Sequence, residues 1–248
     1  MTGKVKLGLV AAMEREIKPL VRGWRIVPVN AGARNTKAFV RADTALMCAG
    51  IGDAGPVTRM LIESFDPEVV ISVGFAGSLN PDLQVPAVLI PARVVDGKTG
   101  TEFCTEIGNG TLVTAGHIAD VKTKRELANA FSADAVDMEA SQVAKEAQIA
   151  GRRFLAIKVI SDDADSDISF VSDFVEGHGF DTAGFLAHVA FRPRLWGAVR
   201  NLQVNSNRAQ QVLCSYLEFI IQNTSRLDIA LTRTDTCGVV SAAKYECQ

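Results

Sequence analysis

The chain has 248 residues, of which 48% are apolar, and a formal net charge of -2 at pH 7. A chain of this length can bury a substantial core, and it lacks the basic excess that drives binding to a phosphate backbone, so we expect no nucleic-acid partner. No apolar stretch reaches the roughly 20 residues that cross a bilayer, so we expect no transmembrane segment.

The predicted elements alternate between strand and helix over the first two thirds of the chain. Runs of strand length, several rich in valine and isoleucine and typical of strands buried on both faces, lie at residues 5–11, 45–49, 69–73, 88–95 and 154–160. Apolar residues with helical period lie between them at 14–21, 56–65 and 139–150. This alternation predicts an α/β layered fold with a mixed, largely parallel sheet.

Beyond residue 170 the pattern becomes helical. Apolar residues return with helical period at 195–202 and 209–221, and no strand of comparable quality follows. The tail at 223–248 has no clear periodicity, and we expect it to be irregular. Because there is no internal repeat or linker, residues 1–248 are predicted to form one domain.

The cysteines and histidines indicate neither a disulfide framework nor a metal site. The five cysteines are scattered and form no CxxC pair, and the three histidines lack the HExxH spacing. Unpaired cysteines are typical of a reducing compartment. We therefore expect a cytoplasmic protein that needs neither a metal nor a cofactor.

Two glycine-rich motifs follow predicted strands. GIG, at residues 50–52, precedes a helix whose N-terminal N–H groups are suited to an anion or an oxygen-rich ligand. VGFAG, at 73–77, follows a very apolar strand, at the sheet edge where ligands sit in open α/β folds. A bare turn and a tight connection explain these motifs about equally well when each is taken alone.

Two further motifs carry carboxylates. VDMEA, at 136–140, leads into a helix, where a glutamate is often only a favourable charge at the positive end of the helix dipole. ISDDAD, at 160–165, places three acids after an apolar strand; it lacks the EF-hand pattern of a calcium loop, and a solvated Asx turn is another explanation. Carboxyl groups at the mouth of a sheet are also good acid–base candidates.

Taken together and in order, AAMEREI (11–17), GIG, VGFAG, VDMEA and ISDDAD resemble the nucleoside phosphorylase and nucleosidase superfamily. Within it, the chain is similar to the 5'-methylthioadenosine/S-adenosylhomocysteine nucleosidases. The resemblance covers roughly residues 5 to 170. It implies a three-layer α/β sandwich, a homodimer, and cleavage of the N-glycosidic bond of a purine nucleoside with release of adenine.

The resemblance also implies the site. Glu16 matches the glutamate that activates water, Glu139 the glutamate that binds the ribose hydroxyls, and Asp162 the aspartate that protonates N7 of the purine. Such roles suit the chemistry, because a purine leaves slowly until it is protonated and positive charge develops on the ribose. The substrate-binding residues implied in addition are Gly52, Phe75, Ala76, Gly77, Met138 and Ser161.

The stretch from Gly179 to Trp196 resembles the hopanoid-associated phosphorylase group of the same superfamily. This implies adenosyl-hopane, with a large apolar group at the ribose 5' position, as a substrate, and a place at the periphery of the membrane. Apolar side chains that would line a path for this tail are Phe185, Leu186, Val189 and Phe191, although packing of a core helix explains them as well.

Hydrolysis is favoured over phosphorolysis, which remains the alternative within the enzyme class. Phosphate needs several converging cationic or N–H donors, and the arginines nearest to the motifs, Arg15, Arg34, Arg59 and Arg93, stand outside the family's phosphate-binding sequence. A carboxylate at Glu16 would also repel phosphate. A non-catalytic nucleoside-binding module is the alternative of another class, but such a module could discard the acids, and all three are present.

Overall fold

The computed structural model describes residues 4–31, 34–50, 53–105, 107–168, 174–176, 179–180 and 196–224. Within these residues, 11 strands form one sheet in the order β2-β3-β4-β1-β5-β10-β9-β7-β8, with β11 paired to β5 and β6 paired to β11. The strands are β1 (Leu7–Ala11), β2 (Arg25–Ala31), β3 (Arg34–Arg41), β4 (Thr44–Cys48), β5 (Val69–Ser78), β6 (Val88–Leu89), β7 (Arg93–Asp96), β8 (Glu102–Cys104), β9 (Thr111–Thr114), β10 (Ala135–Asp137) and β11 (Arg153–Asp162). The helices are α1 (Glu14–Ile17), α2 (Ala54–Phe65), α3 (Val121–Phe131), α4 (Ala140–Ile149) and α6 (Trp196–Gln222), and β12 (Val175–Glu176) pairs with β13 (Gly179–Phe180).

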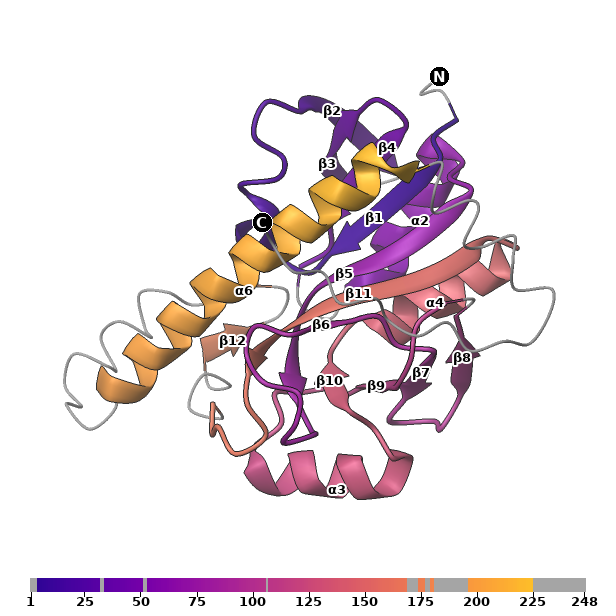
Figure 1. The fold of residues 1–248 in the computed structure, drawn as a ribbon. Helices are drawn as coiled ribbons and strands as arrows, with labels where there is room; N and C mark the ends of the chain where they lie inside the picture. The colour runs from indigo at the N-terminus through magenta and orange to yellow at the C-terminus, as the bar shows by residue number, and fades with distance from the viewer. Residues whose placement is uncertain are drawn as a thin grey trace.

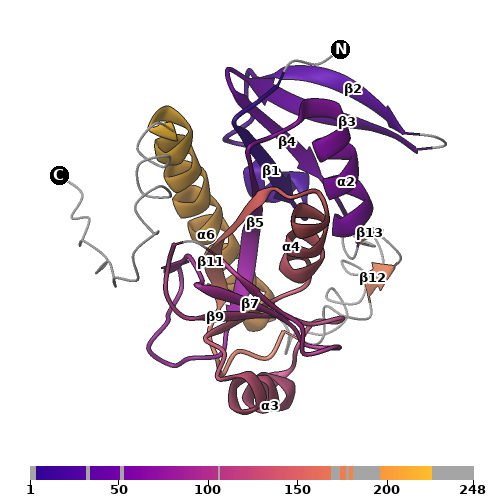
Figure 2. The ribbon, with the colours of Figure 1, turned by 90° about the vertical axis from the view of Figure 1, so that its right-hand side faces the viewer.

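The centre of the sheet is parallel and buried on both faces. β1 lies between β4 and β5, and β11 lies beside β5, with all three pairings parallel. Helices α2 and α4 pack on one face, and α1 and α6 pack on the other (Figure 1, Figure 2). Because both faces are covered, the central strands need no polar alternation and consist largely of aliphatic residues. The layered α/β fold expected from the sequence is therefore confirmed.

The helix α6 has two different halves. In its second half, Ala209, Leu213, Leu217 and Ile220 return with helical period and are buried against the sheet. Its first half reaches beyond the sheet, and Trp196 is 57% exposed (Figure 1). The two helical runs predicted at 195–202 and 209–221 are thus one helix, because the polar residues between them contain no glycine or proline to interrupt it.

Other predicted boundaries need correction. The strand predicted at 69–73 continues as β5 to Ser78, so the VGFAG motif lies within a strand and not in a connection after it. The end of β5 pairs with β10 and β11, partners too distant in sequence for a local pattern to reveal. The run predicted at 88–95 divides into β6 and β7 around Pro91, which lacks the N–H that a continuous ladder requires.

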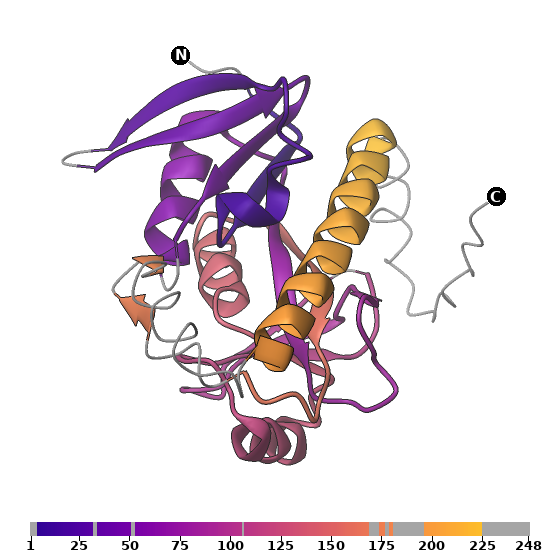
Figure 3. The ribbon, with the colours of Figure 1, turned by 90° about the vertical axis from the view of Figure 1, so that its left-hand side faces the viewer.

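The sequence pattern also missed elements whose apolar runs are interrupted by a proline or by charged and polar residues. β2 and β3 form a long hairpin that extends from one edge of the sheet, and α3 lies at the opposite end of the molecule (Figure 3). The helix predicted at 14–21 ends at Ile17. None of the helices among the described residues is long and apolar enough to span a bilayer. Phe185, Leu186, Val189, Phe191 and the tail beyond Thr224 lie outside the described residues.

Candidate active site

A cavity of about 500 Å³ opens at the carboxyl ends of β1, β5 and β11 and is walled on one side by α6. This is the sheet edge at which ligands bind in α/β folds. Every predicted site residue that the structure describes lines it: Glu16, Phe75, Ala76, Gly77, Met138, Glu139, Ser161 and Asp162. Gly52 lies outside the described residues, and its described neighbours Gly50 and Asp53 are not part of this lining.

Glu16 brings a buried, unsatisfied carboxylate oxygen to the cavity. Its side chain projects from α1, and Oε2 has no hydrogen-bond partner. Burial raises the pKa of Glu16 to about 7, and nearby Lys158 opposes part of that shift. Gly74 makes room for this carboxylate, since a Cβ at that position would lie 2.8 Å from Oε2, and its φ of +146 also favours glycine.

Glu139 stands at the start of α4 but does not serve the helix as a cap. Its side chain makes no capping hydrogen bond, whereas Asp137 accepts a hydrogen bond from the N–H of Ala140 at 2.9 Å. The alternative explanation, a glutamate that merely favours the helix dipole, therefore does not account for its position on the cavity wall. Burial, followed by the charge of Asp137, raises the pKa of Glu139 to about 8.

Beneath the two glutamates lies a buried ion pair. Lys158 Nζ is 2.9 Å from Asp137 Oδ2, and both side chains are inaccessible to solvent. Asp137 also accepts a hydrogen bond from Thr114 Oγ1 at 2.7 Å. Burial by itself lowers the pKa of Lys158, but the carboxylates of Asp137 and Glu139 outweigh it and the pKa is raised. Lys158 is thus a fixed positive charge under the cavity floor.

Neither Asp137 nor Lys158 was among the predicted site residues. A signal for Lys158 did exist, because it is the one charged residue in the otherwise apolar run at 154–160. A lysine in a strand that is buried on both faces needs an anionic partner, since an unpaired buried charge is very costly. The partner itself, 21 residues earlier in the chain, follows only from the packing of β10 near β11.

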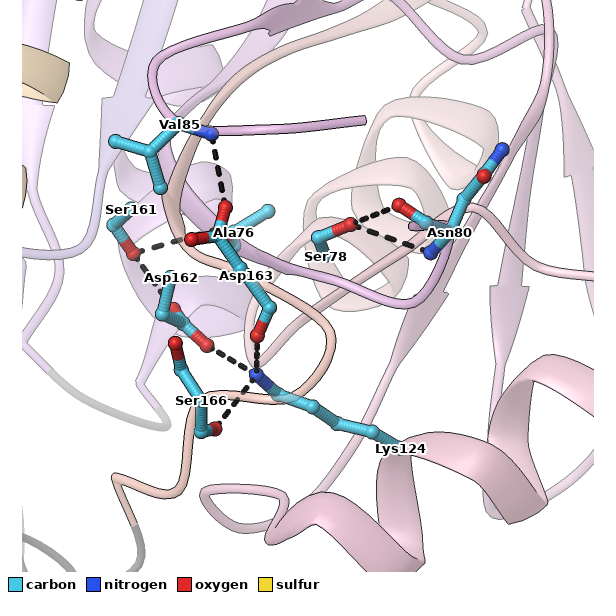
Figure 4. Close-up of polar contacts among 9 residues, drawn as sticks. All are labelled: Ala76, Ser78, Asn80, Val85, Lys124, Ser161, Asp162, Asp163 and Ser166. Atoms are coloured by element: carbon cyan, nitrogen blue, oxygen red, sulfur yellow. Dashed lines mark hydrogen bonds and ion pairs between the residues drawn. The ribbon is translucent and has the colours of Figure 1, made fainter. Parts of the chain in front are cut away.

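Asp162 ends β11 and is held from two sides. Its Oδ1 accepts a hydrogen bond from Ser161 Oγ at 2.9 Å, and its Oδ2 lies 2.5 Å from Lys124 Nζ (Figure 4). A Cβ at Gly77 would approach Oδ2 to 2.8 Å, so this glycine makes room for the acid. The other two acids of the ISDDAD motif diverge, because Asp163 accepts a hydrogen bond from a loop N–H and Asp165 pairs with a surface arginine.

The wall formed by α6 was not predicted at all. It contributes two apolar residues and four polar ones to the cavity, namely Val199, Leu202, Gln203, Ser206, Asn207 and Gln210. Cationic side chains are few: in the part of the chain that the structure describes, Arg15 is the one arginine that lines the cavity. Arg59 and Arg93 instead form ion pairs with Glu146 and Glu102.

A sequence profile described as the Phosphorylase superfamily matches residues 6–115 and 106–190. These matches cover most of the chain and include every motif described above. The chain belongs to the phosphorylase superfamily. The superfamily, and with it an enzyme of the nucleosidase and phosphorylase class, was expected from the motifs and is confirmed.

Two relatives in sequence are 5'-methylthioadenosine/S-adenosylhomocysteine nucleosidases. The protein of a Marinomonas species is 34% identical over 95 residues, which are 36% of this chain and 41% of that protein. The protein of Buchnera aphidicola is 26% identical over 202 residues, with 66% of this chain and 86% of that protein covered.

Solved structures of the superfamily share the fold. The 5'-methylthioadenosine/S-adenosylhomocysteine nucleosidase of Helicobacter pylori, bound to a pyrrolidine compound, has a TM-score of 0.66 at 18% identity, covering 89% of this chain and 99% of its own. Futalosine hydrolase of the same organism has a TM-score of 0.66 at 18% identity, covering 88% and 97%. At such low identity the likeness concerns the fold alone, and it confirms the predicted α/β sandwich.

Proposed function

We propose that this superfamily member hydrolyses the N-glycosidic bond of an adenosine-type nucleoside with a substituent at the ribose 5' position, and releases adenine. The observation that carries the proposal is the buried, unpartnered carboxylate oxygen of Glu16, which faces the same cavity as Glu139 and Asp162. Asp137 also lines the cavity but is paired with Lys158, which leaves Glu16, Glu139 and Asp162 for the substrate. Three separated carboxyl groups suit a reaction that activates water, stabilises a cationic sugar and protonates a leaving base. The sequence relatives, which are nucleosidases, support the same reaction class.

Glu16 acts as the general base. An attacking water needs an acceptor, and the free Oε2 is the acceptor that the cavity offers there. A carboxyl group with a pKa of about 7 takes up a proton far more readily at neutral pH than an ordinary glutamate. Lys158 beneath the cavity floor keeps part of this group ionised.

Glu139 and Asp162 act on the two halves of the substrate. Glu139 forms hydrogen bonds with the ribose hydroxyls, and its ionised form places negative charge near a sugar that becomes oxocarbenium-like as the bond stretches. Asp162 gives its proton to N7, so that the base leaves as neutral adenine. Ser161 and Lys124 hold the Asp162 carboxyl group on the cavity wall.

Water is the favoured nucleophile. Among the described residues, the cationic or titratable nitrogen groups that line the cavity are those of Arg15, His117 and Lys124, and Lys124 is already paired with Asp162. Phosphate would need several free donors converging on one point, next to Glu16 and Glu139, whose ionised forms repel it. Phosphorolysis is therefore the second reaction to test.

The 5' substituent extends towards the first half of α6 in this proposal. Apolar Ile168, Val199 and Leu202 line that side of the cavity, next to polar residues of the same helix. An alkyl or alkylthio group fits such a mixed wall, and the triterpenoid of adenosyl-hopane is the extreme case suggested by the resemblance of the stretch from Gly179 to Trp196.

A series of 5'-alkyl adenosines of increasing length tests the apolar 5' substituent. A kcat/KM that rises with chain length supports an apolar tail, and a steady fall beyond a few carbons contradicts it.

The reaction itself is tested with 5'-methylthioadenosine and purified protein, in phosphate-free buffer and again with added phosphate. Release of adenine together with the free 5-methylthioribose, at a rate that phosphate does not increase, is the expected result. Formation of a ribose 1-phosphate that depends on phosphate would establish phosphorolysis. Nucleoside binding without release of adenine in either buffer would indicate the non-catalytic module.

A further inference from the structure

Lys124 is a buried lysine on α3, whose core-facing apolar residues Leu127, Ala128 and Phe131 are only partly buried. It is the buried residue of α3, and its side chain is only 2% exposed. Ordinary lysines on such a helix point into water, as Lys122 does with a side chain that is 85% exposed. Taking an ammonium group out of water is costly, so its position requires strong compensating contacts.

Those contacts use all three donors of the ammonium group. Lys124 Nζ donates to Asp162 Oδ2 at 2.5 Å, to the carbonyl oxygen of Asp163 at 2.8 Å and to that of Ser166 at 3.2 Å (Figure 4). Since a lysine has three N–H donors, none is left for a substrate. Lys124 therefore serves the loop that follows β11 and, above all, the carboxyl group of Asp162.

The contacts of Asp162 are correspondingly restricted. One oxygen accepts a hydrogen bond from Ser161 and the other from Lys124. Gly77 packs so close to the carboxyl group that a Cβ there would lie 2.8 Å from Oδ2. No described contact other than that of Lys124 places a charge opposite this carboxyl group. The orientation of the acid is thus set by a residue of α3, 38 positions away in the chain.

We propose that Lys124 is the positioning residue of the general acid. This inference rests on the proposed function. The reacting form of Asp162 is the neutral acid, with its proton on Oδ1, because Oδ2 accepts a hydrogen bond from Lys124. As the bond between C1' and N9 breaks, its electron pair passes to the purine, N7 takes that proton, and Asp162 is left as a carboxylate. The ammonium group of Lys124 stabilises that developing negative charge and keeps Oδ2 in place, so it lowers the barrier of the proton-transfer step without touching the substrate.

The test compares Lys124→Met with Lys122→Met, which removes an exposed lysine from the same helix. On 5'-methylthioadenosine, Lys124→Met should lower kcat by about 100-fold or more with KM within about threefold, because general acid catalysis is worth about 100- to 10,000-fold. Lys122→Met should match the wild type. A Lys124→Met protein with more than about a third of wild-type kcat overturns the proposal.

A double-mutant cycle separates this role from general damage to the fold. Asp162→Asn removes the acid, so adding Lys124→Met to it should lower kcat by less than about threefold more. The double variant also leaves no unpaired buried charge, so it can be measured even if Lys124→Met alone does not fold. A further loss of tenfold or more shows that Lys124 does not act through Asp162, and overturns the proposal.

The leaving group supplies a second readout. Nitrophenolate departs from 4-nitrophenyl riboside without being protonated, so this substrate does not need the general acid. The ratio of wild-type kcat to Lys124→Met kcat should therefore be about 100 on 5'-methylthioadenosine and close to one on the nitrophenyl riboside. Equal loss on both substrates would show a structural role and overturn the inference. If the wild type releases no adenine from any nucleoside, the proposed function has failed, which is a different outcome.

Discussion

Glu16 and Glu139 lie on the same cavity but differ in their surroundings. Glu16 has an unpartnered oxygen. After burial, the strongest influence on the pKa of Glu16 is the positive charge of Lys158, whereas for Glu139 it is the negative charge of Asp137. The different environments fit different tasks, with a free oxygen for water at Glu16 and a carboxyl group beside the sugar at Glu139.

We therefore expect Glu16→Gln and Glu139→Gln to lose activity in different ways. Glu16→Gln should bind a nucleoside within about threefold of wild type and lose about 100-fold or more in kcat, since only the attack of water is impaired. Glu139→Gln should weaken both binding and turnover, because an amide is a poorer partner for two hydroxyls and carries no charge. Calorimetry and initial rates measure both quantities, and equal losses of affinity would refute this division.

Gly77 offers a second test at a single position. A methyl group there would meet Asp162 Oδ2 at 2.8 Å, closer than real Cβ atoms approach, so Gly77→Ala should displace the acid. We expect kcat to fall about 10- to 100-fold, as small misplacements of catalytic groups do. Gly116→Ala is the matched control, because its Cβ meets no atom within 4 Å. Similar rates for both variants would mean that Asp162 is not held where it acts.

The sequence identified the carboxylates but not their partners, for a physical reason. Glu16, Glu139 and Asp162 stand in short motifs, so their identities are visible locally. Lys124 lies in the charged segment Lys122-Thr123-Lys124-Arg125-Glu126, which resembles any solvated helix face. Helical period places Lys124 on the same face as Leu127, Ala128 and Phe131, which pack against the core. The group that Lys124 meets near the end of β11 depends on the docking of α3, which the local sequence does not reveal.

Helix α6 contributes to both the core and the cavity. Its second half anchors the helix on the sheet, and Cys214 Sγ donates to the carbonyl oxygen of Glu16 at 3.5 Å, which ties α6 to α1. Its first half supplies the cavity wall. Loss of the anchor should therefore affect stability and the site together.

The anchoring half is tested by Leu217→Ala. Leu217 is fully buried, so its truncation should cost about 2–5 kcal/mol of unfolding free energy. Val204→Ala, at an exposed residue in the first half of the same helix, should cost less than about 0.5 kcal/mol. Urea denaturation of both variants decides the matter, and a Leu217→Ala protein as stable as the wild type would show that α6 is not packed as described.

The stability of the whole molecule should depend on pH through the two glutamates. Both have a pKa near 4.5 when unfolded, and folding raises it to about 7 in Glu16 and to about 8 in Glu139. The folded state therefore binds these protons more tightly than the unfolded state. Their contribution is fully present below about pH 4.5 and is lost as the pH rises through about 7 and 8.

We accordingly expect the unfolding free energy to fall between pH 5 and pH 8.5, by up to about 1.4 kcal/mol per pH unit for each group. Glu139→Gln should be less sensitive to pH over this range, since an amide does not titrate. Urea denaturation at both pH values measures the difference. A wild-type stability that is flat or rises with pH relative to this variant would contradict the raised pKa values.

The sequence by itself determined the layered α/β fold, the superfamily and the three carboxylates that meet at one cavity. It could do so because hydrophobic periodicity and short motifs are local properties of the chain. Only the tertiary structure decided the length of β5, the cavity wall formed by α6, and the pairing of Asp137 with Lys158 and of Asp162 with Lys124. Those features depend on which distant segments pack together, and the free energy of a buried charge is set by the partner that packing brings to it.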